Sequence, residues 1–264
     1  MATVDVPLER IRFGHTKRRD LWWAMPLITF IVFSSFVVYV TWALLQGDHY
    51  HYGNYLSPLY SPELFGNSPH AIFGPWRWPW PIPFVGYSPA MLILVFPLAF
   101  RMTCYYYRGA YYKAFFLTPP SCAVGGAPRR YRGERALLLF QNLHRYTLYI
   151  ALFILVCLWW EAAAAFVLHG RLGIGVGTGV MVINAALLSA YTFGCHSWRH
   201  LIGGRHDCFS CGGSPSVRYG AWKGSTWLNE RHMLFAWCSL AWVAFTDLYI
   251  YLLSTGVVRD RNTW

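Results

Sequence analysis

Long uncharged apolar runs limit what this chain can fold into more than any other feature of its sequence. Hydrocarbon offers backbone groups no hydrogen-bond partner, so a run of roughly 20 apolar residues crosses a bilayer only as a helix. The composition, 56% apolar and 12% charged, is typical of a membrane protein. We therefore predict an all-α integral membrane protein, with residues 1–264 as one membrane domain. Its five spanning helices are expected at residues 21–45, 89–107, 136–168, 174–201 and 233–253, and Pro97 is expected to kink the second.

The distribution of Lys and Arg predicts the orientation, because short positive loops stay on the cytoplasmic side. Residues 10–19, 101–135 and 199–231 are rich in Lys and Arg, whereas residues 47–88 contain only Arg77. We expect the N-terminus inside, the C-terminus outside, an aromatic outer loop at 47–88 and a cytoplasmic loop at 202–231. The net charge of +11 comes from blocks beside the apolar runs, which favours anionic lipids and a docked protein over nucleic acid as partners.

Three cysteines and three histidines are concentrated between Cys195 and Cys211. Cys208 and Cys211 form a C-x-x-C followed by two glycines, a spacing that lets both thiolates reach one metal ion. His196 and His200 are four residues apart, so both imidazoles leave one face of a helix. Two Cys and two His are a ligand set for zinc or for a Rieske-type [2Fe-2S] centre. A thiol-disulfide pair and a purely structural turn are the alternatives.

Three further histidines are alternate ligands. His206 lies within the Cys/His segment, and the expected topology brings His144 and His232 to the same membrane face. Either of the latter could replace His196 or His200, or serve at a quinone headgroup. Haem needs axial histidines, and the first two expected helices contain none, so two stacked haems are excluded and one haem b is an alternative.

Glu161, Asn184 and Asp247 are polar groups within the expected helices, where an ionisable residue is costly and is a functional hypothesis by default. They are candidates for a proton path to the outside. The alternative is that Glu161 lies near an interface and Asp247 bonds a neighbouring helix.

Three segments resemble the membrane-anchor subunit of actinobacterial succinate dehydrogenases, particularly the mycobacterial type with one large anchor polypeptide. They are Arg12-Phe-Gly-His-Thr-Lys-Arg-Arg-Asp-Leu-Trp-Trp, Pro75-Trp-Arg-Trp-Pro-Trp-Pro, and residues 195–213. The resemblance implies a multi-pass protein of the bacterial plasma membrane, in a complex whose flavoprotein subunit oxidises succinate and whose iron-sulfur subunit relays electrons to quinone. The anchor would not itself be catalytic for succinate oxidation.

Menaquinone or ubiquinone would be the acceptor, and a further small membrane subunit is compatible with such a complex. A cluster with Cys208, Cys211, His196 and His200 as ligands would carry the electrons, because histidine ligation raises a cluster's potential. Haem b and a zinc-stapled scaffold without a redox role are the alternatives. A positive surface would dock the partner subunit and anionic lipid, and its residues are Arg129, Arg130, Arg132, Arg135 and Lys223.

Overall fold

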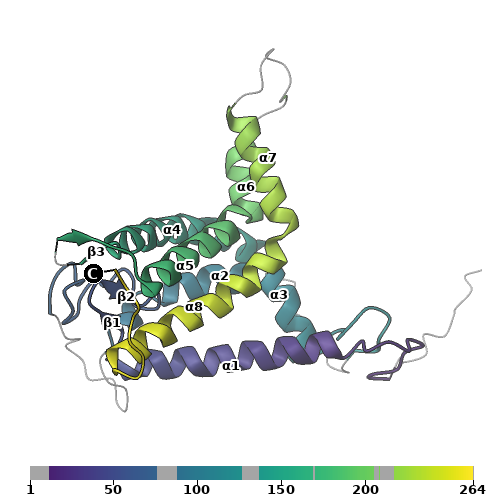
Figure 1. Ribbon diagram of the computed structural model, residues 1–264. Helices are drawn as coiled ribbons and strands as arrows, with labels where there is room; N and C mark the ends of the chain where they lie inside the picture. The colour runs from purple at the N-terminus through teal and green to yellow at the C-terminus, as the bar shows by residue number, and fades with distance from the viewer. Residues whose placement is uncertain are drawn as a thin grey trace, which may run out of the picture. The chain divides into compact units, whose positions relative to one another are not determined.

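The structure is a computed structural model that describes residues 12–75, 88–126, 137–168, 170–204, 208 and 217–263. It is mainly helical, with two short antiparallel hairpins (Figure 1). Its helices are α1 (Ala24–Gln46), η1 (Pro89–Leu92), α2 (Val95–Thr103), α3 (Tyr105–Tyr111), η2 (Tyr112–Phe116), α4 (Leu137–Ala164), α5 (Val176–Phe193), α6 (His196–Gly203), α7 (Val217–Glu230) and α8 (His232–Ser254). Strands β1 (His51–Tyr52) and β2 (Tyr55–Leu56) form one hairpin, and β3 (Val167–Leu168) and β4 (Arg171–Leu172) form the other.

Within the described residues, four helices are long and apolar enough to cross a membrane: α1, residues 142–164 of α4, α5 and α8. The segment 89–107, expected as a kinked spanning helix, is not among these four and is divided into shorter helices. This segment begins as the 3-10 turn η1, continues as α2 and breaks at Cys104, whose backbone is extended with ψ 127°. Two prolines explain the early breaks, because Pro89 and Pro97 lack the N–H that continues a helix and are tolerated in a first turn.

Three other expected segments differ from the structure. The segment expected as one helix at 174–201 is two helices, α5 and α6, with a break at Gly194 and Cys195. The loop expected at 202–231 contains α7. The helix expected at 136–168 ends earlier, at Ala164, where the chain enters the β3–β4 hairpin. Helices α1 and α8 lie close to the ranges expected for them.

The chain forms two compact units, residues 1–35 with 101–143 and residues 36–100 with 144–264, and each is described by itself. In the second unit, α4, α5 and α8 share a core of small and apolar side chains, including Ala162, Ala165 and Ala185. Small residues let membrane helices approach closely, and indole N–H groups add bonds between helices. Trp242 on α8 donates to the backbone oxygen of Val180 at 3.1 Å.

The described part of the loop at 47–88 is a packed cap. Tyr50 and Tyr60 stack with ring centroids 4.2 Å apart, and Tyr60 donates to the backbone oxygen of Ala43 at the end of α1. Leu56 is fully buried in the same cluster. Residues 76–87, which include most of the Trp- and Pro-rich run, lie outside the described residues.

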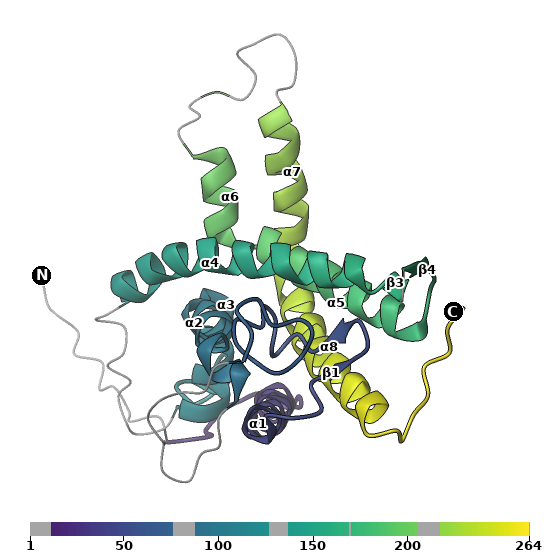
Figure 2. The same ribbon diagram turned by 90° about the vertical axis from the view of Figure 1, so that its left-hand side faces the viewer.

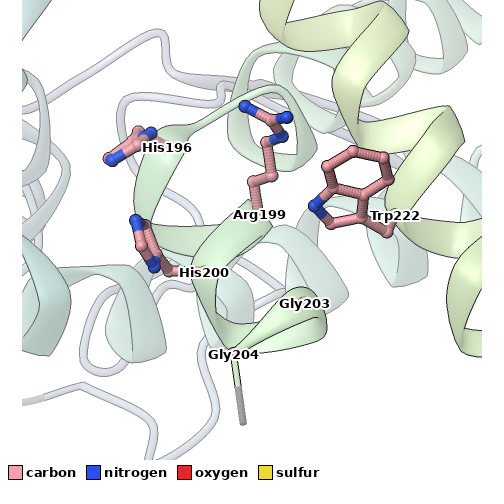
Figure 3. A pocket seen from close by; sticks show the side chains of 6 residues that line it. All are labelled: His196, Arg199, His200, Gly203, Gly204 and Trp222. Carbon is pink, nitrogen blue, oxygen red and sulfur yellow. The ribbon is translucent and has the colours of Figure 1, made fainter. Parts of the chain in front are cut away.

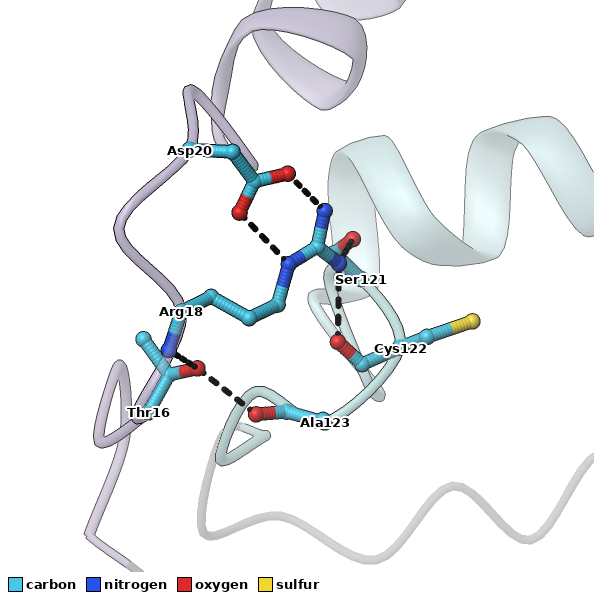
Figure 4. Close-up of polar contacts among 6 residues, drawn as sticks. All are labelled: Thr16, Arg18, Asp20, Ser121, Cys122 and Ala123. Carbon is cyan, nitrogen blue, oxygen red and sulfur yellow. Dashed lines mark hydrogen bonds and ion pairs between the residues drawn. The ribbon is translucent and has the colours of Figure 1, made fainter.

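In the first unit, the N-terminal arm is bonded to the loop at 121–123 (Figure 4). Arg18 pairs with Asp20, donates to the Ser121 hydroxyl at 2.8 Å and donates to the Cys122 carbonyl at 2.9 Å. Thr16 donates to the carbonyl of Ala123 at 2.8 Å. One guanidinium thus uses its fixed fork of donors to hold two chain segments together.

Candidate functional site

The break between α5 and α6 sets the position of the Cys/His segment. A Cβ on Gly194 would meet the carbonyl oxygens of Ala190 at 2.9 Å and Leu228 at 3.0 Å, so only glycine lets α7 pack this closely. The carbonyls left open at the end of α5 accept bonds from α7. Asn229 donates to Gly194 at 2.7 Å, and Ser225 donates to Phe193 at 3.0 Å. The chain then restarts as α6 at His196.

Helices α6 and α7 lie side by side in both views (Figures 1 and 2). A pocket of about 330 Å³ opens along them (Figure 3). The expected pairing of His196 and His200 on one helical face is confirmed, since their ring centroids are 4.5 Å apart with the planes at 80°. The pocket is lined by His196, Arg199, His200, Gly203, Gly204 and Trp222.

Arg199 and Trp222 close the side of the pocket toward α7. The guanidinium carbon lies 4.7 Å from the indole centroid, and Arg199 donates from Nε to the hydroxyl of Thr226 at 3.1 Å. Gly203 makes room for this indole, because a Cβ there would lie 2.5 Å from Trp222 Cδ1. Cation–π contact and close helix packing therefore fix the wall of the pocket.

The surroundings of His196 lower its pKa. Burial is the largest cause, and the neighbouring His200 and Arg199 lower the pKa further. An imidazole that ligates a metal or accepts a hydrogen bond needs a nitrogen without a proton. The lowered pKa of His196 therefore favours the form that either role requires.

A second His/Cys pair lies buried at the start of α6. Nε2 of His144 on α4 is 3.0 Å from Sγ of Cys195, and the two residues are only 6% and 2% exposed. His144 also stacks on Phe100, with ring centroids 4.6 Å apart and the planes at 10°. Sequence reasoning named His144 as an alternate ligand but did not single out Cys195. The two are 51 residues apart, and only the fold brings them together.

His232, the other alternate ligand, has an aromatic partner as well. Its ring stacks on Tyr191, with centroids 4.9 Å apart, and Tyr191 meets the edge of Phe100 at 5.7 Å. A row of four rings thus runs from His144 to His232. His144 is buried, whereas His232 is half-buried.

The remaining predicted ligands are described only in part. Cys208 is disulfide-bonded in this structure, and Cys211 and His206 lie outside the described residues. Within the described ranges, no group of three or more His, Cys, Asp and Glu side chains is arranged to hold a metal ion. The described residues therefore bring together pairs of donors, His196 with His200 and His144 with Cys195, rather than a complete site.

Two of the three intrahelical polar residues have clear partners. Asp247 is buried and accepts from Tyr39 at 2.6 Å and from Ser57, which agrees with the expectation that it bonds neighbouring segments. Glu161 is paired with His70 at 3.1 Å, at the end of α4. Both carboxylates are bonded to residues of the loop at 47–88.

Comparison with known proteins identifies the family. A family description, actinobacterial succinate dehydrogenase subunit SdhC, matches residues 24–256. Among solved structures, the chain is similar to one from the Mycobacterium smegmatis Sdh1 complex in the apo form, with 38% identity, 97% of each chain covered and a TM-score of 0.84. The comparison with curated proteins gave no match. The four apolar helices and this likeness show a multi-pass protein of the bacterial plasma membrane. The chain therefore belongs to the family of membrane-anchor SdhC subunits of actinobacterial succinate dehydrogenase.

Proposed function

We propose that this chain anchors the flavoprotein and iron-sulfur subunits of succinate dehydrogenase and passes electrons from the iron-sulfur subunit to quinone. The observation that carries the proposal is the gathering of His and Cys side chains where α4, α5, α6 and α8 meet. Neutral imidazole and thiolate are ligands that suit electron-transfer centres. The similar chain in the Mycobacterium smegmatis Sdh1 complex supports the assignment of partners.

We propose that the α6–α7 end of the second unit faces the cytoplasm. Its exposed and half-buried cations, Arg199, Arg218, Lys223 and Arg231, agree with the rule that positive segments stay inside. The β1–β2 hairpin at the opposite end of α8 would then face outward. With the N-terminus inside and the C-terminus outside, the chain must cross the membrane an odd number of times. We therefore propose that the η1–α2 segment crosses the membrane as a fifth span.

We propose two alternative ligand sets for a two-iron cluster or zinc, and the first uses the C-x-x-C. Its thiolates would form only on reduction, because Cys208 is disulfide-bonded in this structure. Cys208, Cys211, His196 and His200 supply two sulfurs and two nitrogens, the ligand chemistry of a Rieske-type [2Fe-2S] centre. Such a centre, when bound, accepts and releases one electron at a time. His196 and His200 lie close enough on α6 to act together, and the lowered pKa of His196 favours the ligating form.

A second ligand assignment has its own observation. His144 and Cys195 are adjacent and almost fully buried, so together they would supply one sulfur and one nitrogen shielded from water. His232 on its aromatic stack is a further buried nitrogen donor. Under this assignment the open pocket with His196 and His200 is left for the quinone headgroup, whose carbonyl oxygens accept bonds from imidazole N–H groups.

The residues of the pocket have defined tasks in quinone reduction. A volume of about 330 Å³ is within the range of small-molecule sites. His200 and His196 can donate to carbonyl oxygens and return protons from the cytoplasmic side as the ring is reduced. Trp222 and the paired Arg199 keep the pocket wall in place.

The proposal is tested by comparing two activities of the purified complex. Replacing His196 and His200 by Ala should abolish succinate:quinone reductase activity while succinate oxidation with a soluble artificial acceptor is retained. The soluble acceptor bypasses the anchor, so this split separates a defect in the anchor from loss of the dehydrogenase.

The matched control is His15→Ala, which changes an imidazole in the first unit. It should leave both activities at the wild-type level. Full quinone reductase activity in the His196 and His200 variants would mean that this pocket takes no part in the reaction.

A further inference from the structure

His70, in the outer loop, is bonded at both ring nitrogens to oxygen atoms. Nδ1 lies 3.1 Å from Oε2 of Glu161 on α4, and Nε2 lies 3.1 Å from the carbonyl oxygen of Gly53 in the β1–β2 turn. The side chains of His70 and Glu161 are each only 11% exposed. One imidazole thus joins the loop, the hairpin turn and the end of a spanning helix.

The protonation state follows from counting donors. A backbone carbonyl oxygen and a carboxylate only accept, whereas a neutral imidazole has a single N–H. A neutral ring beside a carboxylate offers one N–H for two acceptors. Both bonds can therefore exist together only when the His70–Glu161 pair has bound one additional proton. Imidazole is the stronger base of the two groups, so this proton belongs on the ring.

We propose that His70 is a proton-binding clamp, which ties the outer loop to α4 and to the β1–β2 turn when its ring is doubly protonated and releases one tie when the ring loses a proton. In the orientation proposed above, this clamp responds to the acidity outside the membrane. Deprotonation leaves one N–H for two acceptors, so either Glu161 or Gly53 loses its bond.

The surrounding charges agree with a cation at this position. Glu161 on α4, Glu63 in the same loop and His51 on β1 are the titratable groups that act on the ring. Burial alone would lower the pKa of His70, but the bond to Glu161 and its negative charge outweigh burial and raise it. The neighbouring His51, whose ring centroid is 6.4 Å away, has its pKa lowered by burial and by the charge of His70.

The sign of the pH dependence follows. Because folding raises the pKa of His70, the clamp contributes fully below the ordinary value of 6.5 and is lost as pH rises through the raised value. The loop should therefore be ordered at acid pH and loosened at alkaline pH.

The direct test is solid-state nitrogen NMR of the complex in lipid, with labelled histidine and the His70→Gln variant to assign the resonance. We expect both ring nitrogens of His70 to be protonated at pH 5.5 and one to lose its proton as pH rises to 9. A ring that stays neutral at pH 5.5 would overturn the proposal, and so would one that is unchanged across the range.

Hydrogen exchange of the complex tests the clamp itself. Three backbone bonds report on the loop: Ile72 to Glu63 at 2.9 Å, Phe73 to Leu64 at 2.9 Å and Gly66 to Gly74 at 3.2 Å. After correction for intrinsic exchange rates, the protection of these three amides should fall about tenfold between pH 5.5 and 9, because one charge-assisted hydrogen bond of the loop is lost.

Two variants separate the clamp from general loosening. His70→Gln has one donor nitrogen, and its amide oxygen cannot donate to the second acceptor, so it should show the low protection at every pH. His51→Gln is the matched control, since His51 Nδ1 is buried without a hydrogen-bond partner, and it should keep the wild-type pH dependence. The same pH dependence in His70→Gln as in the wild type would refute the clamp.

Discussion

Replacing Gly194 by Ala should disturb the junction that places Cys195 and His196. The backbone there is right-handed, with φ −81° and ψ −5°, so Ala is allowed by its torsion angles. Its Cβ would nevertheless lie 2.9 Å and 3.0 Å from two backbone oxygens, which cannot rotate away. Overpacking typically costs about 1–3 kcal/mol, and Ala gains about 0.5–1 kcal/mol over Gly in a helix. The difference of the two ranges is an expected net loss of about 0–2.5 kcal/mol, centred near 1 kcal/mol.

The matched control is Gly179→Ala on the same helix. A Cβ at Gly179 meets nothing within 4 Å, so this change should be neutral or should stabilise by up to about 1 kcal/mol. Thermal unfolding in detergent, followed by tryptophan fluorescence, measures both. Because Gly194→Ala shifts α6 against α7, it should also lower quinone reductase activity more than activity with a soluble acceptor. Equal stability of the two variants would refute the argument that backbone contact with α7 requires glycine at 194.

Three further predictions concern polar contacts elsewhere in the two units. Asp260 accepts hydrogen bonds from Tyr55 at 2.7 Å, from Tyr249 at 2.8 Å and from the backbone of Gly177 at 3.1 Å. Asp260→Ala should therefore lower the free energy of unfolding by about 2–4 kcal/mol, and an unchanged unfolding midpoint would contradict this. Tyr39→Phe removes one of the two donors to buried Asp247 and should cost about 1–3 kcal/mol, whereas Tyr52→Phe, at an exposed ring, should cost nothing measurable. Arg18→Ala should release the N-terminal arm, seen as faster chymotrypsin cleavage at exposed Phe13; cleavage at the wild-type rate would show that other bonds hold the arm.

Hydropathy predicts the spanning helices well only where the run is uninterrupted. Helices α1 and α8 follow uncharged runs and lie close to their expected ranges. The break at Gly194 is not visible in sequence, because the residues before it are apolar and the groups that bond the open end of α5 come from α7, more than 30 positions along the chain. Helix α7 is missed for a similar reason. It contains Gly220 and Gly224 and is stabilised by contacts with α6, including the bond between Arg199 and Thr226.

Sequence predicts only those parts of the candidate site whose residues are neighbours along one helix. Helical spacing placed His196 and His200 on one face, because residues four apart are neighbours on a helix. The contact of His144 with Cys195 depends on how α4 packs, which spacing along the chain does not encode. His70 was not singled out at all, although a histidine in a loop beside an intrahelical Glu161 is the kind of partner that a membrane carboxylate needs.

The most direct test of the central claim is low-temperature electron paramagnetic resonance, with metal analysis and optical spectra, on the detergent-purified complex reduced by succinate. The account predicts a Rieske-type signal from the anchor. Under the first ligand assignment the signal is lost in Cys208→Ser and in Cys211→Ser, and under the second, in which His144 and Cys195 are ligands, it is lost in Cys195→Ser. Cys238→Ser should leave the signal intact. A haem Soret band in place of that signal would establish a cytochrome anchor, and zinc without any signal would contradict an electron-transfer role.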